Sequence, residues 1–303
     1  MKVLVTGAAG ALARIVMEQL VEDHEVVGVD VRRLLDGRLI PGPFEYVRRY
    51  NQRRMADVFR RHRPDALLHL GRARSMELST RKRYDQNVLG TRYLLELCAH
   101  GGVREVVVLS TFHVYGAHQY NHVLLDEDEP LRAIQTFPEI ADSVELDHAA
   151  TTFLWRHREA RTVVLRPVHI VGPSLNNLMS RLLRLRRCPK LWGYDPLMQF
   201  MHERDAARAI LLALTGDRVG VYNVAGEGVV PWSRAIRLAG RRPMAIPHVL
   251  AYPAAAALPE RFFPDHLLDY FRYATVVSDQ RFREEYGFTP AFSTVDTLGA
   301  VRR

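Results

Sequence analysis

The chain has 303 residues, of which 48% are hydrophobic and 25% charged, so it can bury a large core and is not disordered. Its net charge of +8 comes almost wholly from arginine, because lysine occurs only at Lys2, Lys82 and Lys190. The arginines are spread along the chain without a nucleic-acid-binding motif. This pattern indicates a solvated basic surface and no nucleic-acid partner.

The first predicted elements are a strand at the N-terminus, a small-residue turn and a helix over residues 12–22. In the turn, Gly7 allows a tight bend and Gly10 allows the backbone to approach a pyrophosphate closely. Ala13 is small enough for close packing of the helix on the strand. The helix N-terminus presents amide N–H groups and a positive dipole end to phosphates. The stretch therefore predicts a dinucleotide-binding turn.

A second apolar strand over residues 25–30 ends in Asp30, at the position where an acid meets a cofactor ribose hydroxyl. Arg32 and Arg33 follow directly and could instead meet a 2′-phosphate, or could be solvated loop residues. We therefore expect NAD as the cofactor, with NADP left open.

The alternation of strands and helices continues along the chain. Strands are predicted over residues 44–47, 64–71 and 105–109, and helices over residues 53–62 and 86–100. This order predicts an α/β fold, a Rossmann-type doubly wound parallel sheet with a smaller, mixed α/β C-terminal lobe. We place the dinucleotide-binding domain at residues 1–172 and the substrate lobe at 173–303, with possible interleaving of sheet and helices between them.

Several motifs together carry a resemblance to a known family. They are Thr6-Gly7-x-x-Gly10, Asp30, His69-Leu70-Gly71, Asn87-x-x-Gly90-Thr91, Ser110-Thr111-x-x-Val114-Tyr115-Gly116, and Leu165-Arg166-Pro167 with Val171-Gly172-Pro173. The later segments 199–207, 221–226 and 279–290 continue the pattern. The chain resembles the extended short-chain dehydrogenase/reductases, and within them the NAD-dependent epimerases and dehydratases that act on nucleotide sugars.

The resemblance implies roles for the matching positions. Asp30 would meet the adenosine ribose, Asn51 the adenine edge, and Gly71 the nicotinamide side of the cofactor. Asn87 would support the central helix, and Thr111 would hydrogen-bond the reacting substrate oxygen. The predicted cofactor-binding residues are Gly7, Ala9, Gly10, Ala11, Leu12, Asp30, Arg32, Asn51, Leu70, Gly71, Arg72, Asn87 and Pro167. Arg72 and Arg74 depart from the family's small residues; they could clamp a phosphate, crowd the pocket or point outward.

The family's catalytic Tyr-x-x-x-Lys pair is absent from the whole chain. Such a pair lies on one helix face, where the lysine charge lowers the tyrosine pKa for proton transfer. Ser143 matches the serine that commonly precedes the lysine, which puts Ile140 at the tyrosine position and Val144 at the lysine position. Aliphatic side chains cannot move a proton, so the family's usual mechanism is unavailable.

Other residues could replace this pair. His113 lies two residues beyond Thr111 and is competent for acid/base work near neutral pH, or it could be structural. Asp142, Glu145 and His148 cluster on the predicted helix that lacks the pair, although acids there also fit a helix start. Tyr115 is usually structural in such proteins.

The C-terminal part offers weaker signals. The basic stretch with Arg181, Arg184, Arg186 and Arg187 could face a diphosphate or be a solvated helix face. Segment 250–273, rich in Ala, Pro and Phe, is a possible lid or partner surface. Prolines in residues 243–259 exclude a spanning helix, so membrane contact is unsupported.

The chain has two cysteines, Cys98 and Cys188, which are too few for a disulfide framework and do not have the spacing of metal ligands. The N-terminus is predicted to be a core strand, without a signal peptide. A cytoplasmic protein without a metal is therefore expected.

Two classes of function remain open from the sequence. The first is a cofactor-binding epimerase/dehydratase-like enzyme of altered or weak redox activity, using Thr111 with His113 or another residue on a nucleotide-sugar-like substrate. The second is a non-catalytic sensor of NAD(H), or an interaction protein in which Arg72 fills the pocket. By family analogy the protein could form a homodimer through the helices near Asn87 and Asp142.

Overall fold

The structure, a computed structural model, describes residues 1–303 except 35–39, 74–78, 138–139, 248, 250–264 and 303. At its centre is a seven-stranded parallel sheet with the order β11-β6-β5-β4-β1-β2-β3. The strands are β1 (Lys2–Thr6), β2 (Glu25–Asp30), β3 (Phe44–Tyr46), β4 (Ala66–His69), β5 (Glu105–Leu109), β6 (Arg161–Pro167) and β11 (Gly220–Val224). The predicted α/β, Rossmann-type doubly wound sheet is confirmed.

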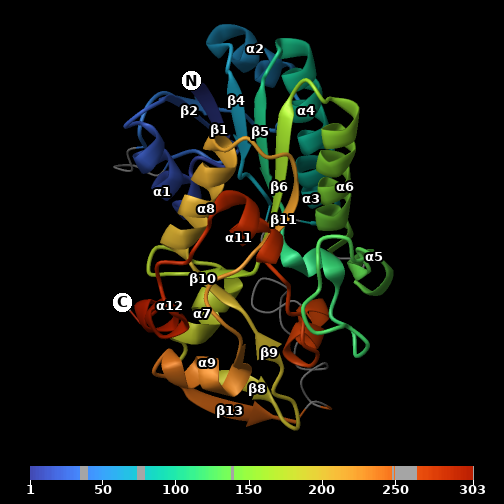
Figure 1. Ribbon diagram of the computed structural model, residues 1–303, viewed down its shortest axis with the longest axis vertical. Helices are drawn as coiled ribbons and strands as arrows, with labels where there is room; N and C mark the ends of the chain where they lie inside the picture. The colour runs from blue at the N-terminus through green and yellow to red at the C-terminus, as the bar shows by residue number, and fades with distance from the viewer. Residues whose placement is uncertain (35–39, 74–78, 138–139, 248, 250–264, 303) are drawn as a thin grey trace.

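Helices cover both faces of this sheet (Figure 1). They are α1 (Ala11–Leu20), α2 (Arg53–His62), α4 (Gly90–Gly101), α6 (Ala141–Arg156) and α8 (Glu203–Thr215). Side chains alternate along each strand. On β1, Val3 and Val5 join the hydrophobic core beneath α1 and α8, whereas Leu4 joins the core beneath α2, α4 and α6. Both faces are buried, which explains the uninterrupted apolar runs of these strands.

The helix predicted over residues 86–100 belongs to a longer helical run. It begins with α3 (Thr80–Tyr84), passes through the π-helical turn η1 (Asp85–Leu89) and continues as α4. Gly90 permits this path, because a Cβ there would lie 3.2 Å from the Cβ of Tyr50. The π-helical turn holds Asn87, whose contacts at the site are described below.

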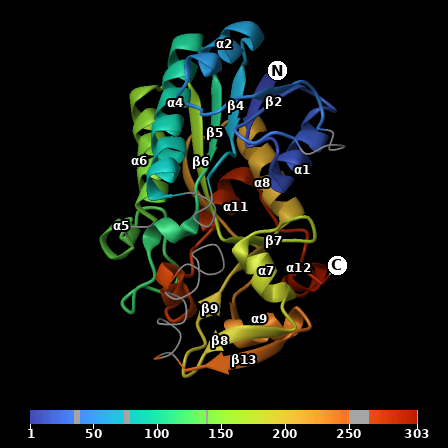
Figure 2. The same cartoon turned by 180° about the vertical axis from the view of Figure 1, so that it is seen from behind.

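The C-terminal segments gather beyond the carboxyl edge of the sheet (Figures 1 and 2). Three strand pairs join β7 (His169–Val171) with β10 (Phe200–His202), β8 (Arg187–Leu191) with β13 (Arg242–Ile246), and β9 (Leu197–Met198) with β12 (Val230–Pro231). The helices there are α7 (Leu178–Arg184), α9 (Trp232–Leu238) and α12 (Thr294–Ala300), whereas α11 (Gln280–Tyr286) packs back against β11 of the large sheet. A third hydrophobic core forms around the fully buried Trp232. The remaining elements are η2 (Phe112–Tyr115), α5 (Ala133–Thr136) and η4 (Asp265–Phe271).

The chain returns to the large sheet after its first excursion into these segments. Residues 203–224 form α8, which packs against α1, and β11, which pairs with β6. The sheet therefore draws on both predicted ranges, in the interleaved manner that the sequence left open. The division into lobes at 1–172 and 173–303 stays a prediction.

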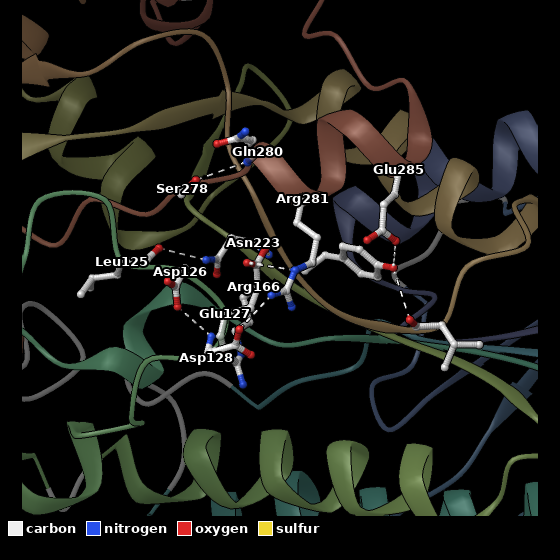
Figure 3. A network of polar contacts seen from close by, with 12 residues as sticks. Leu125, Asp126, Glu127, Asp128, Arg166, Asn223, Ser278, Gln280, Arg281 and Glu285 are labelled. Carbon is white, nitrogen blue, oxygen red and sulfur yellow. Dashed lines mark hydrogen bonds and ion pairs between the residues drawn. The ribbon is translucent and has the colours of Figure 1, made fainter.

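A buried ion pair fixes α6 to the sheet. Arg166 on β6 binds both carboxylate oxygens of Asp147 on α6, with Nη2–Oδ1 at 2.7 Å and Nε–Oδ2 at 2.9 Å. Ser110 Oγ donates to the same carboxylate at 2.5 Å. The Arg166 Nη1 donates onward to the carbonyl of Glu127, whose carboxylate accepts the backbone N–H of Asn223 on β11 (Figure 3). This network joins β5, β6, β11 and α6 at the carboxyl edge of the sheet.

Candidate active site

A cavity of about 540 Å³ opens at the carboxyl edge of the sheet, where ligands bind in open α/β folds. Its wall is formed by the β1–α1 turn, the ends of β4, β5 and β6, the first turn of α6, and parts of α7 and η4. It therefore extends from the glycine turn to the C-terminal segments.

The glycine turn has no room for side chains. Gly7 has a φ of +73°, and a Cβ there would lie 2.6 Å from the Cα of Gly71. Gly10 donates its N–H to the carbonyl of Gly7 at 2.8 Å and is the N-cap of α1. Ala11 and Leu12 line the cavity at the first turn of α1, where amides have no intrahelical acceptors. These residues fit a pyrophosphate, the group that the turn predicts.

Asp30 ends β2 at the cavity wall, and its buried carboxylate already accepts several hydrogen bonds. The N–H of Ala9 donates to Oδ2 at 2.9 Å, and the N–H of Arg32 donates to Oδ1 at 2.7 Å. The half-exposed guanidinium of Arg32 pairs with the same carboxylate at 3.2 Å. Ala9 does not line the cavity, because its N–H is turned towards Asp30. The roles of Asp30 and Arg32 at the cofactor stay predictions.

Tyr50 lies beneath the glycine turn, a position that the sequence did not single out. Its hydroxyl accepts the N–H of Gly7 at 3.1 Å, and a Cβ on Gly71 would lie 2.4 Å from that oxygen. Burial raises the pKa of Tyr50 far above its usual range, so it stays protonated. The neighbouring Asn51, predicted at the adenine edge, does not line the cavity, and its buried Oδ1 has no hydrogen-bond partner among the described residues.

A buried hydrogen-bond chain locks the end of β4 between β1 and α4. Nε2 of His69 lies 2.8 Å from Thr91 Oγ1, which itself donates to the carbonyl of Asn87 at 2.6 Å. His69 therefore donates from Nε2 and accepts at Nδ1 from Thr6 Oγ1, at 2.7 Å. Thr6 Oγ1 in turn accepts the N–H of Gly71. This chain positions the predicted Leu70–Gly71 segment at the cavity wall.

The neutral state of His69 makes the fold sensitive to acid. Burial lowers its pKa to about 4, whereas the unfolded chain has the ordinary value of about 6.5. Between these values the unfolded state binds more protons, so stability is complete above pH 6.5 and falls as the pH drops towards 4. We expect His69 to account for a loss of about 3 kcal/mol over this range.

Chemical unfolding at several pH values checks this expectation. The His69→Gln variant should be less stable at pH 7 but should lose less further stability at pH 4.5. His100→Gln, at an exposed helix position, is the matched control and should keep the native pH dependence. An unchanged acid dependence in His69→Gln would show that the neutral imidazole is not its source.

Thr111 and His113 come together in the cavity. Thr111 follows β5, and the 3₁₀ turn η2 begins directly after it, so the two residues face the same space. Thr111 Oγ1 lies 2.8 Å from His113 Nδ1. The carbonyl of His113 accepts the hydroxyl of Tyr270 at 2.6 Å, which fixes the turn from the C-terminal side. The arrangement gives a hydroxyl and an imidazole in direct contact at the cavity wall.

The two positions assigned to the missing catalytic pair differ in their surroundings. Ile140 is the N-cap of α6 and lines the cavity, whereas Val144, one turn later, is fully buried in the hydrophobic core. Neither side chain can carry charge or a proton. The register that assigns them to the tyrosine and lysine positions stays a prediction.

Of the three alternative acid/base residues on α6, only Asp142 lines the cavity. Its Oδ2 accepts the side-chain N–H of Asn87 at 2.5 Å. Asn87 also exchanges hydrogen bonds with the backbone of Ala73, so it supports the wall without lining it. Glu145 pairs with Arg92 instead, and His148 is exposed.

Aromatic and basic residues complete the wall. His169, at the start of β7, lies with its ring centroid 5.3 Å from that of His113, and burial lowers its pKa to about 3. Of the predicted residues, Leu70, Arg72 and Pro167 also line the cavity. The sequence missed further lining residues, among them Tyr50, Arg83, Gln86, His169 and Asn177. No local sequence pattern marks these residues as part of the site, because their place at the cavity wall depends on how distant segments pack.

Other predicted features lie elsewhere. None of Arg181, Arg184, Arg186 and Arg187 lines the cavity, and Arg184 donates to the carbonyls of Gly172 and Pro173. Arg74 and residues 250–264 lie outside the described residues. The rest of segment 250–273 does contribute to the wall, through Leu267, Tyr270 and Phe271.

The profile of the NAD dependent epimerase/dehydratase family matches residues 3–225, and the chain belongs to this family. An uncharacterised protein of Mycobacterium tuberculosis is 28% identical over 309 residues, which cover 98% of this chain and 82% of that protein. The solved structure of MoeE5 in complex with UDP-glucuronic acid and NAD has a TM-score of 0.77 at 24% identity, covering 99% of this chain and 97% of that one. The Thermotoga maritima UDP-glucose 4-epimerase with UDP-glucose gives 0.78 at 21% identity, with 99% and 97% covered.

Two searches of the described residues bear on other kinds of site. No helix in that part of the chain is both long and apolar enough to cross a membrane. Within the same residues, no group of three or more His, Cys, Asp or Glu side chains is placed to hold a metal ion.

Proposed function

We propose that this protein is an NAD-dependent redox enzyme that acts on a nucleotide-sugar-like substrate, with Thr111 and His113 in place of the missing tyrosine and lysine. The observation that carries the proposal is the 2.8 Å contact between Thr111 Oγ1 and His113 Nδ1, in the same cavity as the glycine turn. Its activity is altered or weak compared with the family, because the charged lysine is lost.

The residues present fit the cofactor. Gly7, Gly10 and the first amides of α1 would hold the pyrophosphate, and Asp30 would hold the adenosine ribose. Leu70, Gly71 and Pro167 would lie on the nicotinamide side. When bound, the cofactor supplies a hydride acceptor or donor. NADP remains an alternative through Arg32.

The Thr111–His113 pair would handle the proton that accompanies hydride transfer. With His113 Nδ1 accepting from the Thr111 hydroxyl, Oγ1 can accept a hydrogen bond from a substrate hydroxyl. A proton leaving the substrate then passes to Oγ1 as the Thr111 proton passes to Nδ1. Neutral imidazole is a competent base near physiological pH. The rings of His169 and Tyr270 lie beside His113, with centroids 5.3 and 4.7 Å from that of its ring.

Titration calorimetry with NAD, NADH and NADPH, followed by hydride-transfer assays on a panel of nucleotide sugars, tests this proposal. Tight cofactor binding with turnover of at least one nucleotide sugar would support it. Tight binding without turnover on any of them would favour the second candidate, a non-catalytic sensor of NAD(H). That candidate draws support from Ile140, an inert side chain at the cavity wall. Absence of any binding would exclude the enzyme and the sensor and would favour an interaction protein in which Arg72 fills the pocket.

Asp30→Ala is expected to weaken NAD binding by about tenfold or more, because a carboxylate that binds a ribose hydroxyl makes a charge-assisted hydrogen bond. The matched variant Arg32→Ala keeps the carboxylate and should retain NAD affinity. If Arg32→Ala lowers the affinity for NADPH alone, Arg32 meets the 2′-phosphate. An unchanged NAD affinity in Asp30→Ala would show that the acid does not meet the ribose.

The location and assembly are also proposals. Cys98 and Cys188 are both buried free thiols, which suits a reducing cytoplasm. A homodimer through α4 and α6 is proposed by analogy with the family.

A further inference from the structure

One basic residue at the cavity is buried, although the basic residues next to it in the same helix are exposed. Arg83 lies on α3 and is 3% exposed, whereas Arg81 and Lys82 beside it are exposed. Arg83 lines the cavity, and its Nε is buried with no hydrogen-bond partner in the part of the chain that the structure describes. Arginine is almost never buried unless it is paired.

Among the described residues, no carboxylate lies within ion-pair distance of Arg83. Asp142, on the same cavity wall, uses its Oδ2 to accept the side-chain N–H of Asn87 at 2.5 Å. Arg83 therefore reaches the cavity with one buried nitrogen that has no hydrogen-bond partner among the described residues. A negatively charged group that enters the cavity would supply a counter-charge, and the planar guanidinium suits a carboxylate or phosphate.

Arg83 lies on an element that borders the part of the cavity where the proposed reaction takes place. Arg83 precedes Asn87 on the same helical run, and the bond from Asn87 to Asp142 joins this run to the first turn of α6. Ile140 and Ser143 of that segment line the cavity together with Thr111. The pyrophosphate-binding turn lies on a different element, at the start of α1.

We propose that Arg83 forms an anion subsite that selects a substrate with a negatively charged group on its reacting part, a carboxylate in the simplest case. This inference rests on the proposed function, because it takes the cavity as the substrate site. It adds the substrate class: an acidic sugar derivative is preferred over its neutral counterpart.

Two nucleotide sugars that differ in one carboxylate test the proposal. Calorimetry in the presence of NAD should show that the native protein binds UDP-glucuronic acid about tenfold or more tighter than UDP-glucose. Arg83→Met should abolish this preference and leave UDP-glucose affinity unchanged, and Arg83→Lys should keep part of it. The matched control Arg81→Met, on the same helix, should bind like the native protein. An equal loss for both ligands would assign Arg83 to the shared diphosphate and overturn the proposal, as would a preference that survives in Arg83→Met.

A second measurement does not depend on the nucleotide or the cofactor. In the absence of ligand, Arg83→Met should have a Tm at least as high as the native protein, because it removes a charge that has no counter-charge among the described residues. Glucuronate, but not glucose, should raise the Tm of the native protein and of Arg81→Met, and neither should raise that of Arg83→Met. A lower Tm in Arg83→Met, or no effect of glucuronate, would overturn the anion subsite. Failure of NAD or UDP-sugar binding alone, with the glucuronate effect present, would count against the proposed function instead.

Discussion

Asp147→Ala is expected to lower the free energy of unfolding by about 3–5 kcal/mol, the largest stability effect among the substitutions considered. Asp147 is 0% exposed, and its carboxylate accepts two hydrogen bonds from Arg166 and one from Ser110. Removing it leaves a guanidinium buried beside the sheet without its counter-charge. The loss would also release α6, whose first turn forms part of the cavity wall.

Urea unfolding at pH 7 measures this effect, and Glu145→Ala is its matched control. Glu145 lies on the same helix and pairs with Arg92 at 3.0 Å, but both partners are partly exposed. Exposed pairs contribute little, so this variant should change stability by less than about 1 kcal/mol. The double variant Asp147→Ala/Arg166→Met should lose less than the sum of its single variants. Equal effects of Asp147→Ala and Glu145→Ala would mean that the buried pair does not fix the helix.

The sequence was informative where short segments determine the structure by themselves. The strand at residues 105–109 and the helix at 53–62 occur with the predicted bounds, because their apolar patterns are strong and their ends are marked by charged or turn residues. The glycine turn was also predictable, since only glycine tolerates the φ of +73° at Gly7 and the close approach of Gly71.

The sequence was less informative where contacts join distant segments. Tyr50 lies beneath the glycine turn through a contact that spans 43 residues, so nothing near it in the chain predicts this place. Arg83 looks the same as Arg81 in the sequence, and only the packing of α3 against its surroundings separates a buried arginine from an exposed one. Asn51 was assigned by family register, but it does not line the cavity, whereas its neighbour Tyr50 does.

The contact between Thr111 and His113 is an intermediate case. Their separation by two residues at a strand end suggested that both reach the active site, and the structure brings them within 2.8 Å. That contact depends on the turn η2, which is fixed by the hydroxyl of Tyr270 from a segment 157 residues away. The local sequence pattern therefore predicted which residues reach the site, whereas a contact with a distant segment fixes their geometry.

His113→Ala is expected to lower kcat on a turned-over nucleotide sugar by about 10²–10⁴-fold, the range for loss of a general acid or base. Its effect on NAD affinity should be small, because the proposed pyrophosphate and adenosine ribose contacts lie on the glycine turn and β2. Thr111→Ala should give a similar loss, and Thr111→Ser, which keeps the hydroxyl, should restore most of the rate. Steady-state kinetics with separate kcat and KM values, and calorimetry for NAD, measure these effects.

The double variant separates a working pair from two independent residues. If the Thr111 hydroxyl passes its proton to His113, Thr111→Ala/His113→Ala should be no slower than the worse single variant, because residues that act as one unit are not additive. His148→Ala is the matched histidine control; His148 is exposed on α6 and should leave kcat unchanged. Asp142 is the acid of α6 that lines the cavity, and its carboxylate binds Asn87 rather than either member of the pair. If His113→Ala keeps its turnover and Asp142→Asn loses it, Asp142 rather than His113 takes the substrate proton. Thr111 would then only orient the substrate through its hydroxyl.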